Sequence, residues 1–227
     1  MRLRKVKDAD LKLKNSKYFV ESPESYKGKW KSLFKNDNPI HIEVGCGKGK
    51  FILELAKTNP DINYIAIEKY DSVLLRVSEK LEELEYDNLK ITILDAKEIS
   101  NFFGEGEIDR IYLNFSDPWP KNHHAKRRLT SKLFLDQYRI ILSDKGEIHQ
   151  KTDNRGLFEF SLESFNENGF KLSNISLDLH KDLEKYPFNI TTEFEEKWAP
   201  NGPIYRLEAR KWVKCLPLLE EKLIKKL

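Results

Sequence analysis

A glycine-rich turn is the first feature of this chain that could support chemistry. Gly45, Gly47 and Gly49 alternate directly after the apolar run 40–44, and a helical pattern starts at residue 51. A turn of this kind between a strand and a helix is a common cradle for a nucleotide-containing cofactor. The spacing is GxGxG, which matches neither the GxGxxG of dinucleotide-binding turns nor the GxxxxGK[ST] of a P-loop.

Acidic side chains accompany this turn and the strands that follow it. Glu43 precedes the first glycine, Glu68 ends the second expected strand and Asp95 ends the third. A carboxylate beside the turn would repel a pyrophosphate, whereas S-adenosylmethionine carries two cationic groups and no phosphate. Glu68 could accept hydrogen bonds from the ribose hydroxyls, and Asp95 with Ala96 would lie at the adenine ring. The acids therefore favour S-adenosylmethionine as the cofactor.

The fourth expected strand runs into a turn stiffened by proline. Asp117 and Trp119 flank Pro118, and Pro120 follows. Because proline fixes φ, this turn would hold the carboxylate and the indole ring at the same sheet edge as the glycines. An aromatic ring and a carboxylate suit a flat base that carries hydrogen-bond donors on its edge. The alternative is a rigid loop with Trp119 packed in the core.

Positive charge is clustered, although the net charge is only +3. Residues 1–17 hold seven lysines and arginines against two aspartates, and residues 121–128 hold four lysines and arginines, two histidines and no acid. Such clusters can follow a phosphate backbone. The alternative for each cluster is a solvated charged surface.

These candidate residues need a fold that brings strand ends together. Strand and helix patterns alternate from residue 40 to residue 168, which predicts an α/β fold with a parallel sheet and helices on both faces. We expect strands at 40–44, 62–68, 90–95, 109–115 and 146–152, and helices at 51–59, 72–85, 131–142 (ended by a turn at 144–146) and 155–168. Residues 170–179 and 204–213 look like strands with no helix between them, which predicts an antiparallel hairpin at one sheet edge.

The chain divides into three expected segments. Residues 1–39 read as a basic arm with a short helix, residues 40–213 as the catalytic domain, and residues 214–227 as a tail. No apolar run reaches the roughly 18 residues of a membrane span, and the first residues lack a signal-peptide core. Cys46 and Cys215 make no disulfide framework, which favours the cytoplasm. No zinc-binding spacing occurs, so we expect no metal.

Several spaced motifs together resemble the bacterial tRNA (guanine-N7)-methyltransferases. They are EVGCGKG at 43–49, SDPWPK at 116–121, HHAKRR at 123–128, KTDN at 151–154, TEFE at 192–195 and GPIYR at 202–206. The resemblance covers roughly residues 38–212. It departs from the family pattern at Phe194, where tyrosine is usual, and at Gln150, where an apolar residue is more common.

The resemblance implies a Rossmann-like, doubly wound methyltransferase domain, mostly parallel with an antiparallel edge hairpin. It implies S-adenosylmethionine as the cofactor, tRNA as the partner, guanosine 46 of the variable loop as the target, and a monomer or a homodimer. The implied cofactor residues are Glu43, Gly45, Gly47, Gly49, Glu68, Asp95, Ala96 and Asp117, of which Asp117 is also the catalytic candidate. The implied substrate residues are Lys121, Asp153, Thr192, Glu193, Phe194 and Glu195. The implied RNA contacts are His123, His124, Lys126, Arg127 and Arg128.

Methylation at guanine N7 makes particular demands on a site. N7 is a bare lone pair, so the reaction needs no general base, and nearby carboxylates stabilise the cationic product. We expect Asp117, Asp153 or Glu195 to accept hydrogen bonds from the Watson–Crick edge of guanine. An amino-methyltransferase is disfavoured because Trp119 separates the prolines of its usual motif. A non-catalytic RNA-binding module and a nicotinamide dehydrogenase are the remaining alternatives.

Overall fold

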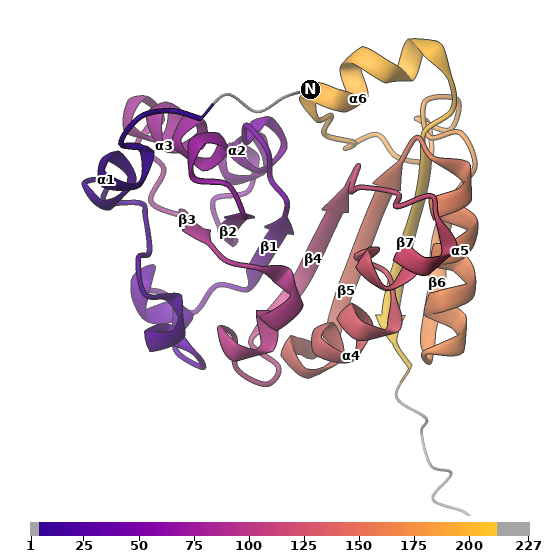
Figure 1. Ribbon diagram of the computed structural model, residues 1–227, viewed down its shortest axis with the longest axis horizontal. Helices are drawn as coiled ribbons and strands as arrows, with labels where there is room; N and C mark the ends of the chain where they lie inside the picture. Colours follow the sequence, from indigo (N-terminus) through magenta and orange to yellow (C-terminus); the bar gives the residue numbers. More distant parts are fainter. Residues whose placement is uncertain (1–4, 213–227) are drawn as a thin grey trace, which may run out of the picture.

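A seven-stranded sheet forms the centre of the molecule (Figure 1). The computed structural model describes residues 5–212. The strand order is β3-β2-β1-β4-β5-β7-β6, and β7 alone runs antiparallel to its neighbours. The strands are β1 (Ile40–Val44), β2 (Asn63–Glu68), β3 (Leu89–Ile93), β4 (Ile108–Asn114), β5 (Leu142–Thr152), β6 (Phe170–Ser176) and β7 (Tyr205–Lys211). The expected α/β fold, with a mostly parallel sheet and an antiparallel pair at one edge, is confirmed.

The strand order defines where a ligand can bind. It differs from the 3-2-1-4-5-6 order of dinucleotide-binding sheets because β7 is inserted between β5 and β6. The order reverses direction between β1 and β4, which are parallel neighbours. Open α/β sheets bind ligands at the carboxyl ends of the strands beside such a reversal. The turns that follow β1 and β4 therefore flank the expected ligand crevice.

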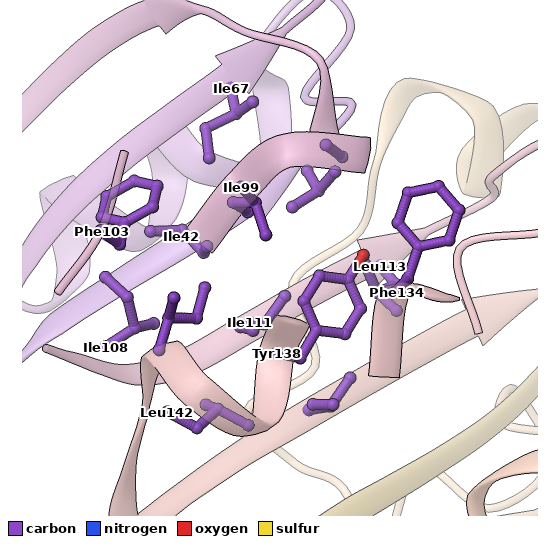
Figure 2. Close-up of a cluster of buried hydrophobic side chains, with 14 of the residues drawn as sticks. Ile42, Ile67, Ile99, Phe103, Ile108, Ile111, Leu113, Phe134, Tyr138 and Leu142 are labelled. Atoms are coloured by element: carbon purple, nitrogen blue, oxygen red, sulfur yellow. The ribbon is translucent and has the colours of Figure 1, made fainter. Parts of the chain in front are cut away.

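Helices cover both faces of the sheet. The first face packs against α1, α2 and α3, and the second packs against α4, α5 and the 3₁₀ helices η2 and η3. Figure 2 shows the hydrophobic cluster on the second face, in which side chains of β1 and β4 pack against Phe134 and Tyr138 of α4. The helices are α1 (Ala9–Lys14), α2 (Lys50–Thr58), α3 (Asp71–Leu84), α4 (Lys132–Ile141), α5 (Arg155–Glu167), α6 (Glu193–Trp198), η1 (Pro23–Tyr26), η2 (Trp30–Leu33), η3 (Ala96–Asn101), η4 (Asn122–Arg127) and η5 (Ala199–Asn201).

Two local expectations are wrong. Helices α6 and η5 lie between β6 and β7, where the sequence predicted no helix. Six residues give too few turns for a periodic signal, and α6 starts at a threonine cap instead. The turn expected at 144–146 is instead part of β5, which begins at Leu142. A shift in the pairing register between Ile108 and Arg110 of β4 accommodates the extra residues of β5 there.

Within residues 5–39, the stretch around Tyr18 and Val20 pairs with the edge strand β3. The N–H of Val20 donates to the carbonyl of Ile91 on β3, and the N–H of Ile91 donates to the carbonyl of Tyr18, both at 2.9 Å. Trp30 is fully buried, and its Nε1 donates to the carbonyl of Phe102 at 2.8 Å. The N-terminal segment therefore covers the exposed edge of β3. The division of the chain into an arm at 1–39 and a catalytic domain at 40–213 remains a prediction. Arg2, Arg4 and the expected 214–227 tail lie outside the described residues. Within residues 5–212, no helix has the length and apolar character needed to cross a membrane.

Candidate active site

The acids expected to bind the cofactor lie at the carboxyl ends of four adjacent strands. Glu43 is in β1, Glu68 ends β2, and Asp95 follows β3 by two residues. Asp117 follows β4, the other strand at the reversal. Because these strands are parallel, the glycine turn and the proline turn leave the sheet at the same edge (Figure 1). The fold thus brings the four acids to the carboxyl ends of the parallel strands, here called the rim, which is the arrangement predicted from the sequence.

The glycine turn presents open backbone at two of its three glycines. Gly45, Gly47 and Gly49 have φ values of 79°, 57° and 83°, a region that glycine adopts without strain. A Cβ atom at Gly45 or Gly47 would meet nothing within 4 Å, whereas one at Gly49 would lie 2.9 Å from both methyl carbons of Val77. Gly45 and Gly47 therefore line a cradle, and Gly49 allows α2 to pack closely against α3.

Glu43 is a buried carboxyl group with one unsatisfied oxygen. Its side chain is 2% exposed, its Oε1 accepts a hydrogen bond from Nδ2 of Asn114 at 2.9 Å, and its Oε2 has no partner among the described residues. Burial raises the pKa of Glu43 to about 8, although the Asn114 hydrogen bond and the charge of Lys151 oppose the rise. A buried acceptor without a partner needs a donor or a cation. This oxygen and the open glycine cradle fit a cationic cofactor such as S-adenosylmethionine.

Asn114 is a residue that the sequence reasoning missed. It is buried at the end of β4 and links that strand to Glu43 on β1. A polar residue at the end of an otherwise apolar strand, directly before the proline turn, was the available signal.

Glu68 and Asp95 are engaged in local hydrogen bonds at the rim. Oε2 of Glu68 accepts from the N–H of Gly47 at 3.2 Å, and Oε1 accepts from the N–H of Lys69 at 2.7 Å. Oε1 also accepts from the N–H of Tyr70 at 3.3 Å. Glu68 therefore fixes the glycine turn, and Oε2, which accepts a single hydrogen bond, keeps capacity for a ligand hydroxyl. Asp95 caps η3, next to buried Ala96. Burial acts to raise the pKa of Asp95, but the Lys69 side chain and the N–H of Lys97 hold it below its ordinary value.

The proline turn has a strained backbone. Phe115 and Trp119 have φ values of 50° and 41°, which side-chain-bearing residues rarely adopt and which cost roughly 1–3 kcal/mol each. The N–H of Phe115 donates to the carbonyl of Lys151 on β5 at 2.8 Å. Asp117 lies between the two strained residues and is exposed. Trp119 is half-buried, with the guanidinium of Arg127 at 4.8 Å from its ring. Backbone strain of this kind is concentrated at active sites and ligand-binding sites, so it makes this turn a candidate functional element.

The segment expected to bind the substrate forms α6 and packs against the proline turn. Oγ1 of Thr192 accepts a hydrogen bond from the N–H of Glu195 at 2.9 Å and so caps α6. The ring of Phe194 lies 4.9 Å from that of Phe115 and stacks at 5.6 Å on Trp198. Phenylalanine therefore makes an aromatic contact where the family usually has tyrosine.

Ion pairs tie the other side of α6 to the helices that follow β1 and β2. Glu196 pairs with Lys50 at the start of α2, and Glu193 lies 3.5 Å from Nζ of Lys80 on α3. Nζ of Lys80 also donates to the carbonyl of Lys48 in the glycine turn at 2.7 Å. Helix α6 thus lies between the glycine turn and the proline turn (Figure 1).

Glu195 is a buried carboxylate, and both of its oxygens have partners within the chain. Its side chain is fully buried, and its Oε2 lies 2.5 Å from Nζ of Lys151. Its Oε1 accepts from Nδ2 of Asn189 and lies 3.1 Å from Nε2 of His180. Both oxygens hold the base of α6 on β5, and the expectation that Glu195 reads the guanine edge remains a prediction. Lys151 is a second residue that the sequence reasoning missed.

The remaining substrate and RNA candidates are mostly exposed. Asp153 directly follows β5 at the same rim and is exposed. The rings of His123 and His124 lie 4.1 Å apart in η4. Lys121, Lys126 and Arg127 are exposed around them. These positions suit contacts with a large anionic partner, and their roles remain predictions.

Arg128 differs from its neighbours in the basic loop. It is only 9% exposed, and its guanidinium donates to the carbonyls of Pro118 and Trp119 at 3.0 Å each. Nε and Nη2 of Arg128 therefore face the proline turn of its own chain, and its expected contact with RNA remains a prediction.

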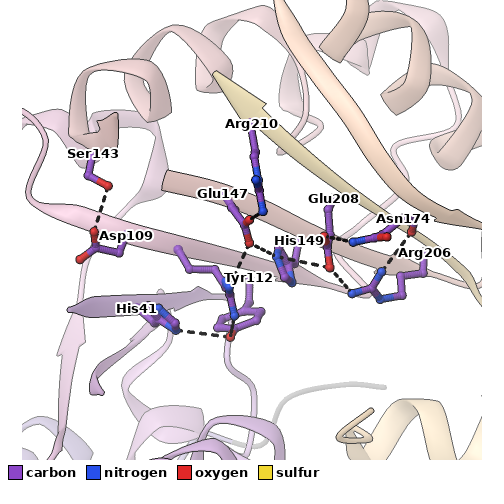
Figure 3. Close-up of polar contacts among 11 residues, drawn as sticks. His41, Asp109, Tyr112, Ser143, Glu147, His149, Asn174, Arg206, Glu208 and Arg210 are labelled. Carbon is purple, nitrogen blue, oxygen red and sulfur yellow. Dashed lines mark hydrogen bonds and ion pairs between the residues drawn. The ribbon is translucent and has the colours of Figure 1, made fainter. Parts of the chain in front are cut away.

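A charged cluster on the first face of the sheet also escaped the sequence reasoning (Figure 3). His149 Nε2 and Arg110 Nη2 lie 2.7 Å and 2.9 Å from Oε2 of Glu147, and Glu208 pairs with Arg206. Hydrogen bonding from His149 lowers the pKa of Glu147 to about 2, and burial lowers the pKa of His149. The cluster lines a cavity of about 810 Å³ that extends toward Asn114 and Lys151 at the rim.

Donor atoms of Glu147, His149 and Glu208 lie within 4.8 Å of one another. Guanidinium groups already pair with both carboxylates. The cluster is therefore balanced by the protein's own cations, and the expectation that the activity needs no metal stays a prediction.

The fold and the acidic rim are those of a methyltransferase, and comparisons with known proteins agree. A family model described as "Putative methyltransferase" matches residues 37–207. Solved structures with the same fold include the 16S rRNA methyltransferase KamB, with a TM-score of 0.61 and 13% identity over 82% of this chain and 94% of that one. An antibiotic-related methyltransferase gives a TM-score of 0.58 at 16% identity over 81% and 92% of the chains. These likenesses show a methyltransferase fold.

Closer relatives identify the family within that class. A Geobacillus protein named tRNA (guanine-N(7)-)-methyltransferase is 55% identical over 85% of this chain and 87% of its own length. Proteins of the same name from Bacillus licheniformis and Streptococcus agalactiae are each 53% identical over 92% of this chain and 98% and 100% of their own lengths. The chain belongs to the tRNA (guanine-N(7)-)-methyltransferase family.

Proposed function

We propose that this chain transfers the methyl group of S-adenosylmethionine to N7 of guanosine 46 in the variable loop of tRNA. One structural observation carries the proposal. The unsatisfied carboxyl oxygen of Glu43 and the open glycine cradle lie at the same rim as the strained turn that bears Asp117. Membership of the family supports the same reaction.

The rim supplies a binding residue for each part of the cofactor. Glu43, Gly45 and Gly47 would hold its cationic end, because the first is an unsatisfied acceptor and the others leave room for a ligand. Glu68 would accept the ribose hydroxyls, and Asp95 would lie at the adenine ring, next to Ala96. When bound, S-adenosylmethionine supplies an electrophilic methyl group on a positively charged sulfur.

The residues around Asp117 have to position guanine rather than remove a proton. The N7 lone pair forms the new N–C bond while the bond between the methyl carbon and sulfur breaks, its electron pair going to sulfur, and no proton leaves the base. The base becomes cationic, so the carboxylates of Asp117 and Asp153 stabilise the charge that develops in the transition state. Placement of N7 in line with the methyl group accounts for most of the acceleration. Helix α6 helps to fix that placement, because Phe194 packs on the proline turn.

Recognition of guanine and of tRNA would use different residues. Asp117 and Asp153 are exposed acceptors that suit N1–H and the N2 amine of guanine, which adenine cannot offer. Lys121, Lys126 and Arg127 would contact phosphates beside them. A tRNA substrate and a buried free thiol at Cys46 agree with a cytoplasmic enzyme, acting as a monomer or a homodimer.

A pair of tRNA transcripts tests the position of methylation. One carries guanosine 46, and the matched control carries adenosine there. Reduction followed by aniline treatment cleaves RNA at N7-methylguanosine, so we expect cleavage at position 46 of the first transcript alone. Cleavage at another guanosine in both transcripts would contradict the variable-loop assignment.

A further inference from the structure

Arg128 is buried against the backbone of the proline turn. Its Nε donates to the carbonyl of Pro118, and its Nη2 donates to the carbonyl of Trp119, both at 3.0 Å. The flat face of the guanidinium lies 4.4 Å from the ring of Phe160 on α5. Hydrogen bonds from a charged donor are stronger than those between neutral groups, and arginine can form two in a fixed geometry.

The two carbonyls belong to the residues that follow Asp117 directly. Trp119 has a φ value of 41°, and Phe115 on the other side of Asp117 has a φ value of 50°. A strained backbone persists only where its surroundings hold it. Arg128 supplies such a hold from the side of α5, in addition to the two prolines of the turn.

The neighbours of Arg128 in η4 lie differently. Lys126 and Arg127 are exposed, and the guanidinium of Arg127 lies 4.8 Å from the ring of Trp119. Arg128 is 9% exposed, which leaves little of its surface for a phosphate. Lys126 and Arg127 are therefore accessible to a large partner, whereas Arg128 is buried and bonds the backbone of the turn.

We propose that Arg128 is a positioning residue for methyl transfer rather than an RNA contact. It fixes the Pro118–Trp119 backbone and thereby the place of the Asp117 carboxylate at the rim. This inference rests on the proposed function, since it takes Asp117 to act on the target base. Loss of the two hydrogen bonds lets the turn relax, and small displacements at a reacting centre are costly.

Arg128→Lys is the decisive variant, because lysine keeps the charge but not the paired geometry. A phosphate contact would largely survive this change, with kcat near that of the wild type. A positioning role predicts that kcat falls about 10- to 100-fold while the cofactor Kd stays within about twofold. Equal losses in kcat and in cofactor affinity would indicate general loss of structure and would overturn the proposal, as would an unchanged kcat.

Salt dependence of tRNA binding gives a second measurement, with Lys126→Met as the matched variant in the same loop. Removal of one phosphate contact lowers the slope of log Kd against log salt by about one. We expect that decrease for Lys126→Met and an unchanged slope for Arg128→Met and Arg128→Lys. A slope lowered by about one in both Arg128 variants would overturn the proposal. If Arg128→Met does not fold, Arg128→Lys alone decides.

The two measurements separate this inference from the proposed function. If the wild-type chain methylates no tRNA, the proposed function fails, and with it the role of Arg128 in catalysis. Salt dependence is measured without methyl transfer and still determines whether Arg128 contacts RNA.

Discussion

Nζ of Lys151 lies 2.5 Å from Oε2 of Glu195, and the two side chains are 7% and 0% exposed. The pair joins the end of β5 to α6, so it holds the proposed substrate segment on the sheet. Burial lowers the pKa of Lys151, and Glu195 opposes that shift. Both groups are therefore best understood as one buried ionic unit, which makes specific predictions about loss of either partner.

Removal of one partner should be more harmful than removal of both. We expect Lys151→Met to lower the free energy of unfolding by about 3 kcal/mol, because it leaves the Glu195 charge buried without its cation. The double variant with Glu195→Met should lose less than the sum of the single changes. Urea unfolding of the four proteins of this cycle measures the coupling. The exposed pair Lys132–Asp136 is the control, where Lys132→Met should cost below about 1 kcal/mol. If the losses in the free energy of unfolding for Lys151→Met and Glu195→Met simply add in the double variant, the two side chains do not act as one ionic unit.

Glu43→Gln should stabilise the free protein and weaken cofactor binding. The folded state holds the Glu43 proton up to about pH 8, while the unfolded carboxyl releases it near its ordinary value of 4.5. A raised carboxyl pKa means that stability falls as the pH rises through this window. We therefore expect Glu43→Gln to raise Tm relative to the wild type at pH 8, by more than at pH 5. Thermal unfolding at both pH values tests this, with the exposed Glu54→Gln as the control. A wild-type advantage at pH 8 would contradict the buried, proton-bearing carboxyl.

Substitution by alanine should affect mainly stability at Gly49 and mainly cofactor affinity at Gly45. Both have left-handed φ values, but only at Gly49 would the new Cβ lie 2.9 Å from the methyl carbons of Val77. We expect Gly49→Ala to lose about 2 kcal/mol or more of stability through strain and overpacking. Gly45→Ala should cost about 1 kcal/mol and instead weaken cofactor affinity, because the methyl group fills the cradle. Tm and calorimetric cofactor titration separate the two effects. Cofactor affinity of Gly45→Ala equal to that of the wild type would show that the cofactor does not bind next to Gly45.

Asp117→Asn and Asp153→Asn should each impair the chemical step. Both carboxylates are exposed at the rim, where they can stabilise the cationic base. Loss of one such group costs about 100-fold in kcat by analogy with other preorganised electrostatic sites. Single-turnover kinetics at saturating tRNA provides the measurement, and unchanged cofactor affinity of Asp153→Asn is the control. If both variants keep the wild-type rate and the preference for guanine, neither carboxylate reads the base.

Much of the rim could be predicted because it depends on local patterns. The alternation of apolar strands and amphipathic helices predicted the order of elements, and strand ends carried Glu43, Glu68, Asp95 and Asp117. Such positions follow from the geometry of parallel sheets without any knowledge of side-chain contacts.

Contacts between distant segments could not be predicted. Glu195 pairs with Lys151, which is 44 residues away, and Asn114 bonds Glu43 at a separation of 71 residues. Arg128 lies in a basic run that suggested an RNA contact, and only the fold brings its guanidinium against the backbone of the proline turn. The charge cluster around Glu147 was missed because alternating charges along β5 and β7 look like a solvated face in sequence.

Nucleoside analysis of a single reaction tests the central claim most directly. The wild-type protein is incubated with methyl-labelled S-adenosylmethionine and unmodified tRNA, and the RNA is digested and separated by mass. We expect the label in N7-methylguanosine, and we expect the Asp117→Asn variant to incorporate much less of it. Label in an exocyclic methylamine of adenine or cytosine, or no label in RNA at all, would contradict it.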